Sequence, residues 1–411
     1  MKRCIDAKLV AMFAAALLGF GAPHMVAGQN AQERASLEQL RREAQPAEDY
    51  VVGKFRDHDI VFLGEGPHYV RQNIEFLQRL ISKLYAAGVH NLGYEFLLSK
   101  DQAKVDELLN GRHYDESLAN DLIFNFRLLH TSFREYRDVL RVAWEINHAL
   151  PADAPRFRVV ALDVPLGPTE WSQLREGEKG MDAKARDRWI GGDYGSRRNI
   201  LWADIISRQF IEKDAKALIY AGSGHTSTRF YAEENPEGTH YEGWHRGHSR
   251  SAGNLIYSYI GDRTFRITLH GSEAGPEVAQ AESLITAAFP EKRQLGVDVR
   301  SVTALGAVPS SQLGYLSPSV TRVGAETAGG CRSFTLADVT DGYVYLAPRS
   351  EFRMQRRITD ILTLQRSREF TRQMQIRKGD RNLSLSDADI ANIVREIDER
   401  NRRDVEGVRN D

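Results

Sequence analysis

Two histidines of this chain directly follow apolar segments, at places where a general base could act. The segment DIVFLG, residues 59–64, leads into GEGPH, which supplies Glu65 and His68. The segment ALIYAG, residues 217–222, leads into GSGH, which ends at His225. An imidazole with an ordinary pKa of about 6.5 exchanges protons near neutrality, and a nearby carboxylate can orient it. This pattern favours an acid–base site over a simple strand-to-helix turn.

Two further apolar segments end in acidic residues. Glu95 lies in NLGYEF, residues 91–96, and Asp163 lies in RVVALDV, residues 158–164. Arg198 opens a helix-like segment, and it is expected to pair with a carboxylate of the site or of a substrate.

The predicted roles divide proton transfer and binding among these groups. His68 is the expected general base on water, and Glu65 and Glu95 orient the two histidines or stabilise their charge. His225 is expected to donate to a developing oxyanion or to serve as the acid. Binding is expected from Asp163 and from glycines that let the backbone approach a ligand closely. These glycines are Gly64, Gly66, Gly222 and Gly224.

The same residues also allow a metal-dependent alternative. Two histidines and two carboxylates, namely Glu65, His68, Glu95 and His225, would suit a divalent transition metal. A Gly-x-Ser-x-Gly motif is absent from the sequence, so a covalent serine mechanism is not expected. The sequence leaves the metal-free and metal-dependent versions open.

The four apolar runs are typical of strands buried on both faces of a parallel sheet. Helical segments separate them; in the first, apolar residues recur from Ile74 to Leu84 and Gly88 suits a C-terminal cap. The alternation predicts an α/β fold with a central, mostly parallel sheet, flanking helices, helical insertions and a C-terminal helical extension. Because the carboxyl ends of parallel strands meet at one edge, the four strand ends are expected to share one site.

Several finer local predictions follow from the same patterns. Two capping boxes, Ser99–Gln102 and Ser132–Glu135, are expected to open helices. Helices are also expected over residues 29–48, around ESLITAAF (282–289) and near 386–403. Three later runs read as β-segments: NLIYSYI (254–260), TFRITL (264–269) and GYVYLA (342–347).

The N-terminus has the order of a secretory signal peptide. Lys2 and Arg3 precede an apolar run over 9–22, and small residues up to Gly28 place cleavage near Ala27. The run is short for a membrane span, although a start-proximal anchor is an alternative. We expect a periplasmic or secreted protein with no stable membrane anchor after cleavage. The formal net charge of -1 gives no general attraction to nucleic acid.

The predicted organisation has three parts: a signal peptide (1–28), an α/β domain (29–348) and a charged helical extension (349–411). The chain of 411 residues, 42 % of them hydrophobic, is long enough for this domain to have a substantial core.

The motifs LGEGPH, YEF, ALD and AGSGH, with an Arg-led helix between the last two, resemble the erythromycin esterase/ChaN-like superfamily over roughly residues 50–348. That superfamily is similar to the Tiki/TraB proteins. Gly64, Glu65 and His68 match the Gly-Glu-x-x-His of the esterase branch, and Gly222 and His225 match its Gly-x-x-His.

The resemblance extends to three positions outside these two motifs. Glu95 matches the family's glutamate after the second strand, and Arg198 with Ala203 matches its helix-start pattern. Trp202 replaces the methionine that is usual before that alanine, so the match is not complete.

The resemblance implies different activities in different branches. Erythromycin esterases open a macrocyclic lactone, with a histidine proposed as base on water; Tiki relatives are metal-dependent proteases; ChaN relatives bind haem. The first branch implies an exported hydrolase acting on a small-molecule ester or lactone. The alternatives are a metal-dependent hydrolase or protease and a non-catalytic protein that binds haem or another ligand. No residue stands out as an axial haem ligand.

Overall fold

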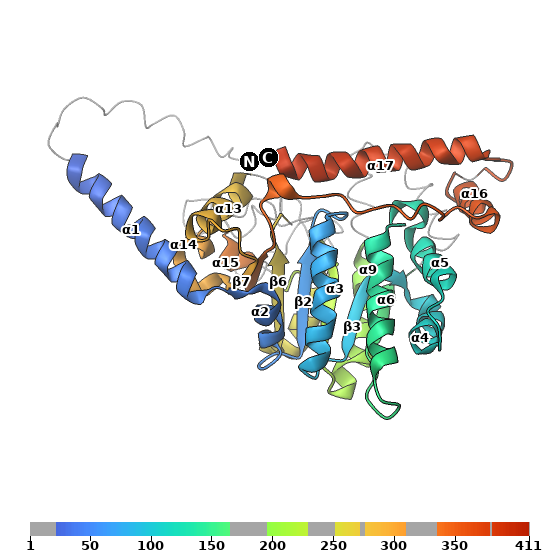
Figure 1. The fold of residues 1–411 in the computed structure, drawn as a ribbon, viewed down its shortest axis with the longest axis horizontal. Helices are drawn as coiled ribbons and strands as arrows, with labels where there is room; N and C mark the ends of the chain where they lie inside the picture. Colours follow the sequence, from blue (N-terminus) through green and yellow to red (C-terminus); the bar gives the residue numbers. More distant parts are fainter. Residues whose placement is uncertain are drawn as a thin grey trace, which may run out of the picture.

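A computed structural model describes residues 22–164, 195–228, 251–271, 276–309, 335–378 and 380–410. Its described strands form one mostly parallel sheet in the order β1-β7-β8-β6-β2-β5-β3-β4 (Figure 1). The strands are β1 (Gln45–Pro46), β2 (Ile60–Glu65), β3 (Asn91–Leu98), β4 (Arg158–Asp163), β5 (Ala217–Gly222), β6 (Thr264–Leu269), β7 (Leu295–Asp298) and β8 (Gly342–Tyr345). Only β7 pairs antiparallel with its neighbours, β1 and β8.

The four predicted strands are consecutive neighbours in this sheet, in the order β2-β5-β3-β4, and all their pairings are parallel. The register places Glu65 opposite Gly222 and Leu98 opposite Asp163. Their carboxyl ends therefore share one edge, as predicted. β5 lies between β2 and β3, so the strand that leads to His225 has a strand of the site on each side.

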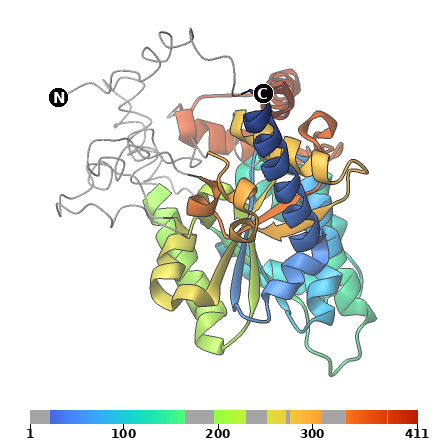
Figure 2. The same ribbon diagram turned by 90° about the vertical axis from the view of Figure 1, so that its left-hand side faces the viewer.

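Helices cover both faces of the sheet (Figure 2). One face carries α2 (Ala47–Lys54), α3 (Arg71–Ala86), α4 (Gln102–Asn110), α5 (Glu116–Arg127) and α6 (Arg134–Ala149), and the other carries α9 (Gly195–Gln209) and α12 (Ala252–Ile260). Since side chains alternate along a strand, Val61 and Leu63 of β2 pack toward the first layer. Ile60 and Phe62 pack toward α9 and α12. Burial of both faces explains why the strands are continuous apolar runs.

The remaining described helices lie at the ends and edges of this core. They are α1 (Ala22–Glu43), α10 (Ser223–Thr226), α13 (Pro276–Ala288), α14 (Thr303–Gly306), α15 (Leu336–Val339), α16 (Leu364–Lys378) and α17 (Asp387–Asn410). Among the described residues, no helix is long and apolar enough to cross a membrane. The predicted signal peptide has its apolar run at residues 9–22. All of this run except Ala22 lies outside the described residues.

One predicted strand is a helix. The run NLIYSYI forms most of α12, whose start is capped by the Ser251 side chain accepting from the Asn254 N–H at 3.1 Å. Asn254 and Ile256 are buried while Tyr259 is 67 % exposed, so one face of a helix is covered and the other is open. A short apolar run does not by itself distinguish a buried helix from a strand, and the cap decides here.

Both predicted capping boxes are wrong: neither helix has a side-chain cap, and Gln102, Ser132 and Glu135 bond elsewhere. In the box Ser99–Gln102, Gln102 instead hydrogen-bonds the backbone of β4. Ser132 donates its hydroxyl to the Leu128 carbonyl at 2.7 Å. Glu135 accepts from the backbone N–H of Arg356 at 2.8 Å, a residue far along the chain.

The finer predictions fail at the N-terminal end, whereas the helix expected near 386–403 is present as α17. The helix expected over 29–48 ends at Glu43, and β1 and α2 follow it. The segment 349–410 packs onto the α/β domain: Phe370, Ile390 and Ile397 share an apolar cluster with Phe124. The C-terminal extension is thus an attached part of the fold (Figure 1).

Candidate functional site

The turn after β2 builds a glutamate–histidine pair. His68 Nδ1 lies 2.9 Å from Glu65 Oε1, three residues back along the chain. The Glu65 side chain is fully buried, whereas that of His68 is 27 % exposed. A carboxylate at Nδ1 holds the proton on that nitrogen and leaves Nε2 available for proton transfer. We refer to this pair as the dyad.

Two tyrosines hold the glutamate of the dyad. The Tyr136 hydroxyl donates to Glu65 Oε1 at 2.9 Å, and the Tyr220 hydroxyl donates to Oε2. Burial raises the pKa of both phenols well above its ordinary value, so they remain protonated donors. These bonds offset the cost of burying a carboxylate. Sequence reasoning missed both tyrosines, although Tyr220 stands out as a polar-tipped residue within the apolar run of β5.

The surroundings of His68 favour its protonated form. Burial alone would lower its pKa, but the hydrogen bond to Glu65 and the charges of Glu95 and Glu65 together raise it. Arg127 opposes this shift. The imidazole is thereby a better proton acceptor than a free one, as a general base requires.

Arg198 joins the ends of three strands. Its Nε lies 2.7 Å from Asp163 Oδ1, its Nη2 lies 3.2 Å from Glu95 Oε1, and its Nη1 lies 3.3 Å from His225 Nε2. All of these carboxylate contacts are buried. The structure thus brings Arg198 together with two acids of the site. Trp202 adds an N–H bond to Asp163 Oδ1 at 3.2 Å, so the residue that departs from the family pattern is part of this network.

Asn199 fixes the tautomer of His225. The Asn199 Oδ1 atom accepts from the backbone N–H of Ala252 at 3.2 Å, which identifies it as the oxygen. His225 Nδ1 lies 2.8 Å from the same oxygen, so Nδ1 carries the proton. Nε2 then accepts from Arg198. Sequence reasoning missed Asn199; its place directly after Arg198 was the only signal.

His225 is neutral in this arrangement. Burial and the charge of Arg198 lower its pKa to about 3, against the opposing effect of Glu95. With Nδ1–H committed to Asn199 and Nε2 accepting, His225 has no proton to offer a ligand. This geometry opposes the donor or acid role predicted for it.

Glu95 lies between the two histidines. Its Oε2 accepts from the Gly222 N–H at 2.7 Å, and its Oε1 lies 3.9 Å from His225 Nε2. Burial opposes ionisation, but attraction to His225, His68 and Arg198 lowers the pKa of Glu95 to about 2. Because His225 is neutral near pH 7, the permanent charge of Arg198 provides the lasting attraction that keeps Glu95 ionised.

Two of the predicted glycines are explained by close packing. A Cβ at Gly222 would lie 3.0 Å from His68 Cε1 and 3.5 Å from Glu95 Oε2, so both side chains pack directly against the Gly222 backbone. A Cβ at Gly64 would lie 2.5 Å from Thr226 Oγ1 in α10. Gly66 lies in the turn after β2 and Gly224 in α10; their role toward a ligand stays a prediction.

The predicted metal set does not fit this geometry. Within the described ranges, no group of three or more His, Cys, Asp or Glu side chains is placed to hold a metal ion. Arg198 occupies the space among Glu95, Asp163 and His225, and tyrosine hydroxyls together with His68 take the Glu65 oxygens. A guanidinium at the centre of the acids supplies the positive charge that a metal would bring.

No family model matches this chain, and no curated protein matches it either. Solved structures with a similar arrangement include a protein from Bacillus cereus, with a TM-score of 0.48 and 13 % identity over 76 % of this chain and 97 % of that one. A mutant of the erythromycin esterase EreC in its open conformation has a TM-score of 0.44 and 14 % identity, covering 72 % and 91 % of the two chains.

ChaN of Campylobacter jejuni, in a structure with cofacial haem, is similar with a TM-score of 0.33 and 13 % identity, covering 54 % of this chain and 85 % of that one.

Proposed function

We propose that this protein hydrolyses an ester or lactone bond of a small molecule, with His68 as general base on water. One observation carries the proposal: a fully buried Glu65, held by two tyrosine hydroxyls, holds Nδ1 of a partly exposed imidazole. In this arrangement a histidine can accept a proton at Nε2 while the carboxylate at Nδ1 stabilises the resulting positive charge.

The reaction would proceed by direct attack of water. His68 Nε2 takes a proton from the water as its oxygen attacks the ester carbonyl, and Glu65 stabilises the imidazolium through Nδ1–H. The same imidazolium then returns the proton to the departing alkoxide as the tetrahedral intermediate collapses. Because His225 is neutral and its Nδ1–H is committed to Asn199, His68 serves in both proton steps.

Arg198 and Glu95 would contribute fixed charges to the site: Arg198 a positive charge for the developing oxyanion, and Glu95 a negative charge that balances it. Arg198 is held by Asp163, Glu95 and His225, so its charge is preorganised. A fixed positive charge near a developing oxyanion lowers the barrier without reorganisation. Glu95 offsets that charge and adds to the raised pKa of His68.

A panel of p-nitrophenyl esters and macrocyclic lactones, assayed with wild type and His68→Ala, tests the proposal. Removing general base catalysis lowers the rate typically by about 10²–10⁴-fold. We expect that loss with a nearly unchanged melting temperature. His113→Ala, an exposed histidine between α4 and α5, is the matched control and should retain wild-type activity. Equal turnover by His68→Ala would contradict the proposal.

We further propose that the hydrolase is exported, on the basis of the Lys/Arg start, the apolar run and the small residues before Gly28. The mature protein from the native host would then begin close to Gly28 or Gln29. N-terminal sequencing measures this directly, and an intact Met1 on cytoplasmic protein would contradict export.

A further inference from the structure

The chain after β8 crosses the edge of the sheet that carries the site, as an extended segment at the N-terminal ends of α3 and α6 (Figure 1). We call residues 349–359 the strap; it opens with a 3₁₀ turn at Arg349–Glu351 and is extended after it. It forms isolated antiparallel bridges first to Val70 and then to Phe133. Val70 closes the loop that carries His68, and Phe133 precedes the helix that carries Tyr136. The strap thus connects the segment that carries the dyad with the helix whose tyrosine holds Glu65.

The strap supplies hydrogen-bond acceptors for the first backbone N–H groups of both helices. Neither α3 nor α6 has a side-chain cap. Instead, the Arg353 carbonyl accepts from the Arg71 N–H at 2.7 Å, and the Arg356 carbonyl accepts from the Arg134 N–H at 2.8 Å. The first N–H groups of a helix have no partner within it, and a buried donor without a partner is costly. Each helix therefore begins where the strap meets it.

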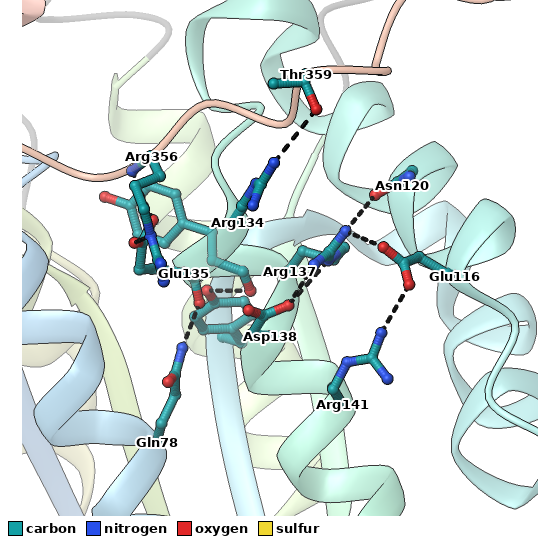
Figure 3. Close-up of polar contacts among 12 residues, drawn as sticks. Gln78, Glu116, Asn120, Arg134, Glu135, Arg137, Asp138, Arg141, Arg356 and Thr359 are labelled. Atoms are coloured by element: carbon teal, nitrogen blue, oxygen red, sulfur yellow. Dashed lines mark hydrogen bonds and ion pairs between the residues drawn. The ribbon is translucent and has the colours of Figure 1, made fainter.

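Two side chains of α6 bind the strap, Arg134 through Thr359 at 3.2 Å and Glu135 through Arg356 (Figure 3). Glu135 is 1 % exposed, and it accepts from Arg356 N at 2.8 Å and from Arg356 Nε at 2.7 Å. Arg71 Nε lies 3.4 Å from the same carboxylate. The next residue along α6 is Tyr136, whose hydroxyl donates to Glu65. A charge-assisted contact of the strap is therefore one residue away from a direct partner of the dyad.

Tyr69, directly after His68, has a left-handed backbone with φ of +80°. For a residue with a large side chain this conformation costs free energy and persists only where the surroundings fix it. The Gln355 N–H donates to the Tyr69 carbonyl at 2.9 Å, and the Tyr69 N–H donates to the Tyr136 hydroxyl at 3.3 Å. The strap and α6 together hold the backbone that aims His68.

We propose that the strap positions the Glu65–His68 dyad, with Glu135 and Arg356 as positioning residues that act through the adjoining tyrosines. A segment outside the predicted α/β domain would then hold the backbone and the tyrosines on which the dyad depends. The placement itself needs no substrate, and only its catalytic consequence rests on the proposed function.

Histidine side-chain titration by NMR on the labelled full chain tests this proposal, with His68→Ala to assign the signal. The variants are Glu135→Gln and Arg356→Ala; the Arg356 side chain is 55 % exposed, so its removal should be tolerated in the fold. The bond to Glu65 raises the pKa of His68. Loosening the strap should therefore lower the His68 midpoint in both variants.

The other charged groups that act on His68 remain in place in these variants. They are Glu95, which favours the imidazolium, and Arg127, which opposes it. Neither contacts the strap through a hydrogen bond or ion pair described in the structure. A shift in the His68 midpoint therefore reports on the dyad.

Arg366→Ala is the matched control. Arg366 is a buried arginine of the same C-terminal extension; it pairs with Asp121 and donates to the carbonyls of Ser117 and Ile361, outside the strap. Its loss should loosen α16 and leave the His68 midpoint at the wild-type value. An unmoved midpoint in both strap variants, or an equal shift in Arg366→Ala, would overturn the proposal.

A substrate from the ester panel adds a second readout. A misplacement of about 1 Å can cost roughly 10²-fold in rate, so we expect kcat of the strap variants to fall by at least tenfold at unchanged KM. If the His68 midpoint shifts as expected while His68→Ala keeps full hydrolysis, the strap proposal stands and the proposed function fails. The two failures are thereby distinguishable.

Discussion

His225→Asn should change how the stability of this protein depends on pH. In the folded chain, burial and Arg198 lower the pKa of His225 to about 3, whereas an unfolded histidine has a pKa of about 6.5. Below pH 6.5 the unfolded state therefore binds a proton that the folded state refuses at this site. Stability must fall as the pH drops through this window, from about 6.5 to about 3.

The size of the effect follows from these two values. Each pH unit below about 6.5 costs up to about 1.4 kcal/mol, so His225 should account for about 2 kcal/mol of stability lost between pH 7 and pH 5. The 17 % exposure of its side chain leaves the group mostly shielded from solvent. Glu95, with a folded pKa of about 2, contributes stability that is lost mainly below pH 5, as the unfolded carboxylate takes up its proton, so it adds little between pH 7 and pH 5.

His68 has the opposite sign. Its folded pKa is raised, so it contributes stability that is fully present below about 6.5 and is lost as the pH rises through the folded value. This contribution partly offsets that of His225 in the wild-type protein. Comparison of wild type with His225→Asn cancels it, because His68 is present in both.

Urea unfolding followed by circular dichroism at pH 7 and at pH 5 measures the effect. Each protein is compared with itself, so any intrinsic loss of stability in the variant cancels. Asparagine can keep a donor near the position of Nδ1, facing Asn199. The loss between the two pH values should be about 2 kcal/mol smaller in His225→Asn than in wild type. Equal losses in the two proteins would refute the assignment of His225 as neutral, and His113→Asn should behave as wild type.

Three further predictions concern packing, the dyad and metals. Gly64→Ala should lower the free energy of unfolding by about 1–3 kcal/mol, since the new methyl group meets Thr226; urea unfolding checks this. Tyr220→Phe should cost about 1.5–3 kcal/mol in the same assay, because the buried Glu65 carboxylate loses a donor, and a change within error would show that the bond is not needed. Dialysis against EDTA should leave ester hydrolysis unchanged, because Arg198 supplies the cation among the acids; a loss restored by added zinc would contradict this.

The sequence by itself determined the strands of the site and the dyad. Each of the four runs is apolar throughout because its strand is buried on both faces, and that composition is readable without knowing the neighbours. Glu65 and His68 are three residues apart in one glycine-containing turn, so their contact is local. Glu95 and His225 follow from the rule that parallel strands end at a common edge, which needs only the strand direction.

Helix starts depended on contacts that no local pattern encodes. Ser132 and Glu135 have the spacing of a capping box, yet Glu135 binds Arg356 because the strap arrives from the far end of the chain. The run NLIYSYI has no periodicity of its own that separates strand from helix, and the layer formed with α9 gives it a buried and an exposed face.

Only the tertiary structure decided which side chains hydrogen-bond the dyad and so determine its protonation. Tyr136 and Tyr220 reach Glu65 from 71 and 155 residues away, and their role depends on which strand lies beside which. The order of the sheet puts β5 between β2 and β3, and this order brings Glu95 against both histidines. A strand's residues specify that it is buried but not its neighbour, because the apolar faces of parallel strands are chemically alike. The protonation states of His68 and His225, raised in one and lowered in the other, therefore follow from the assembled sheet.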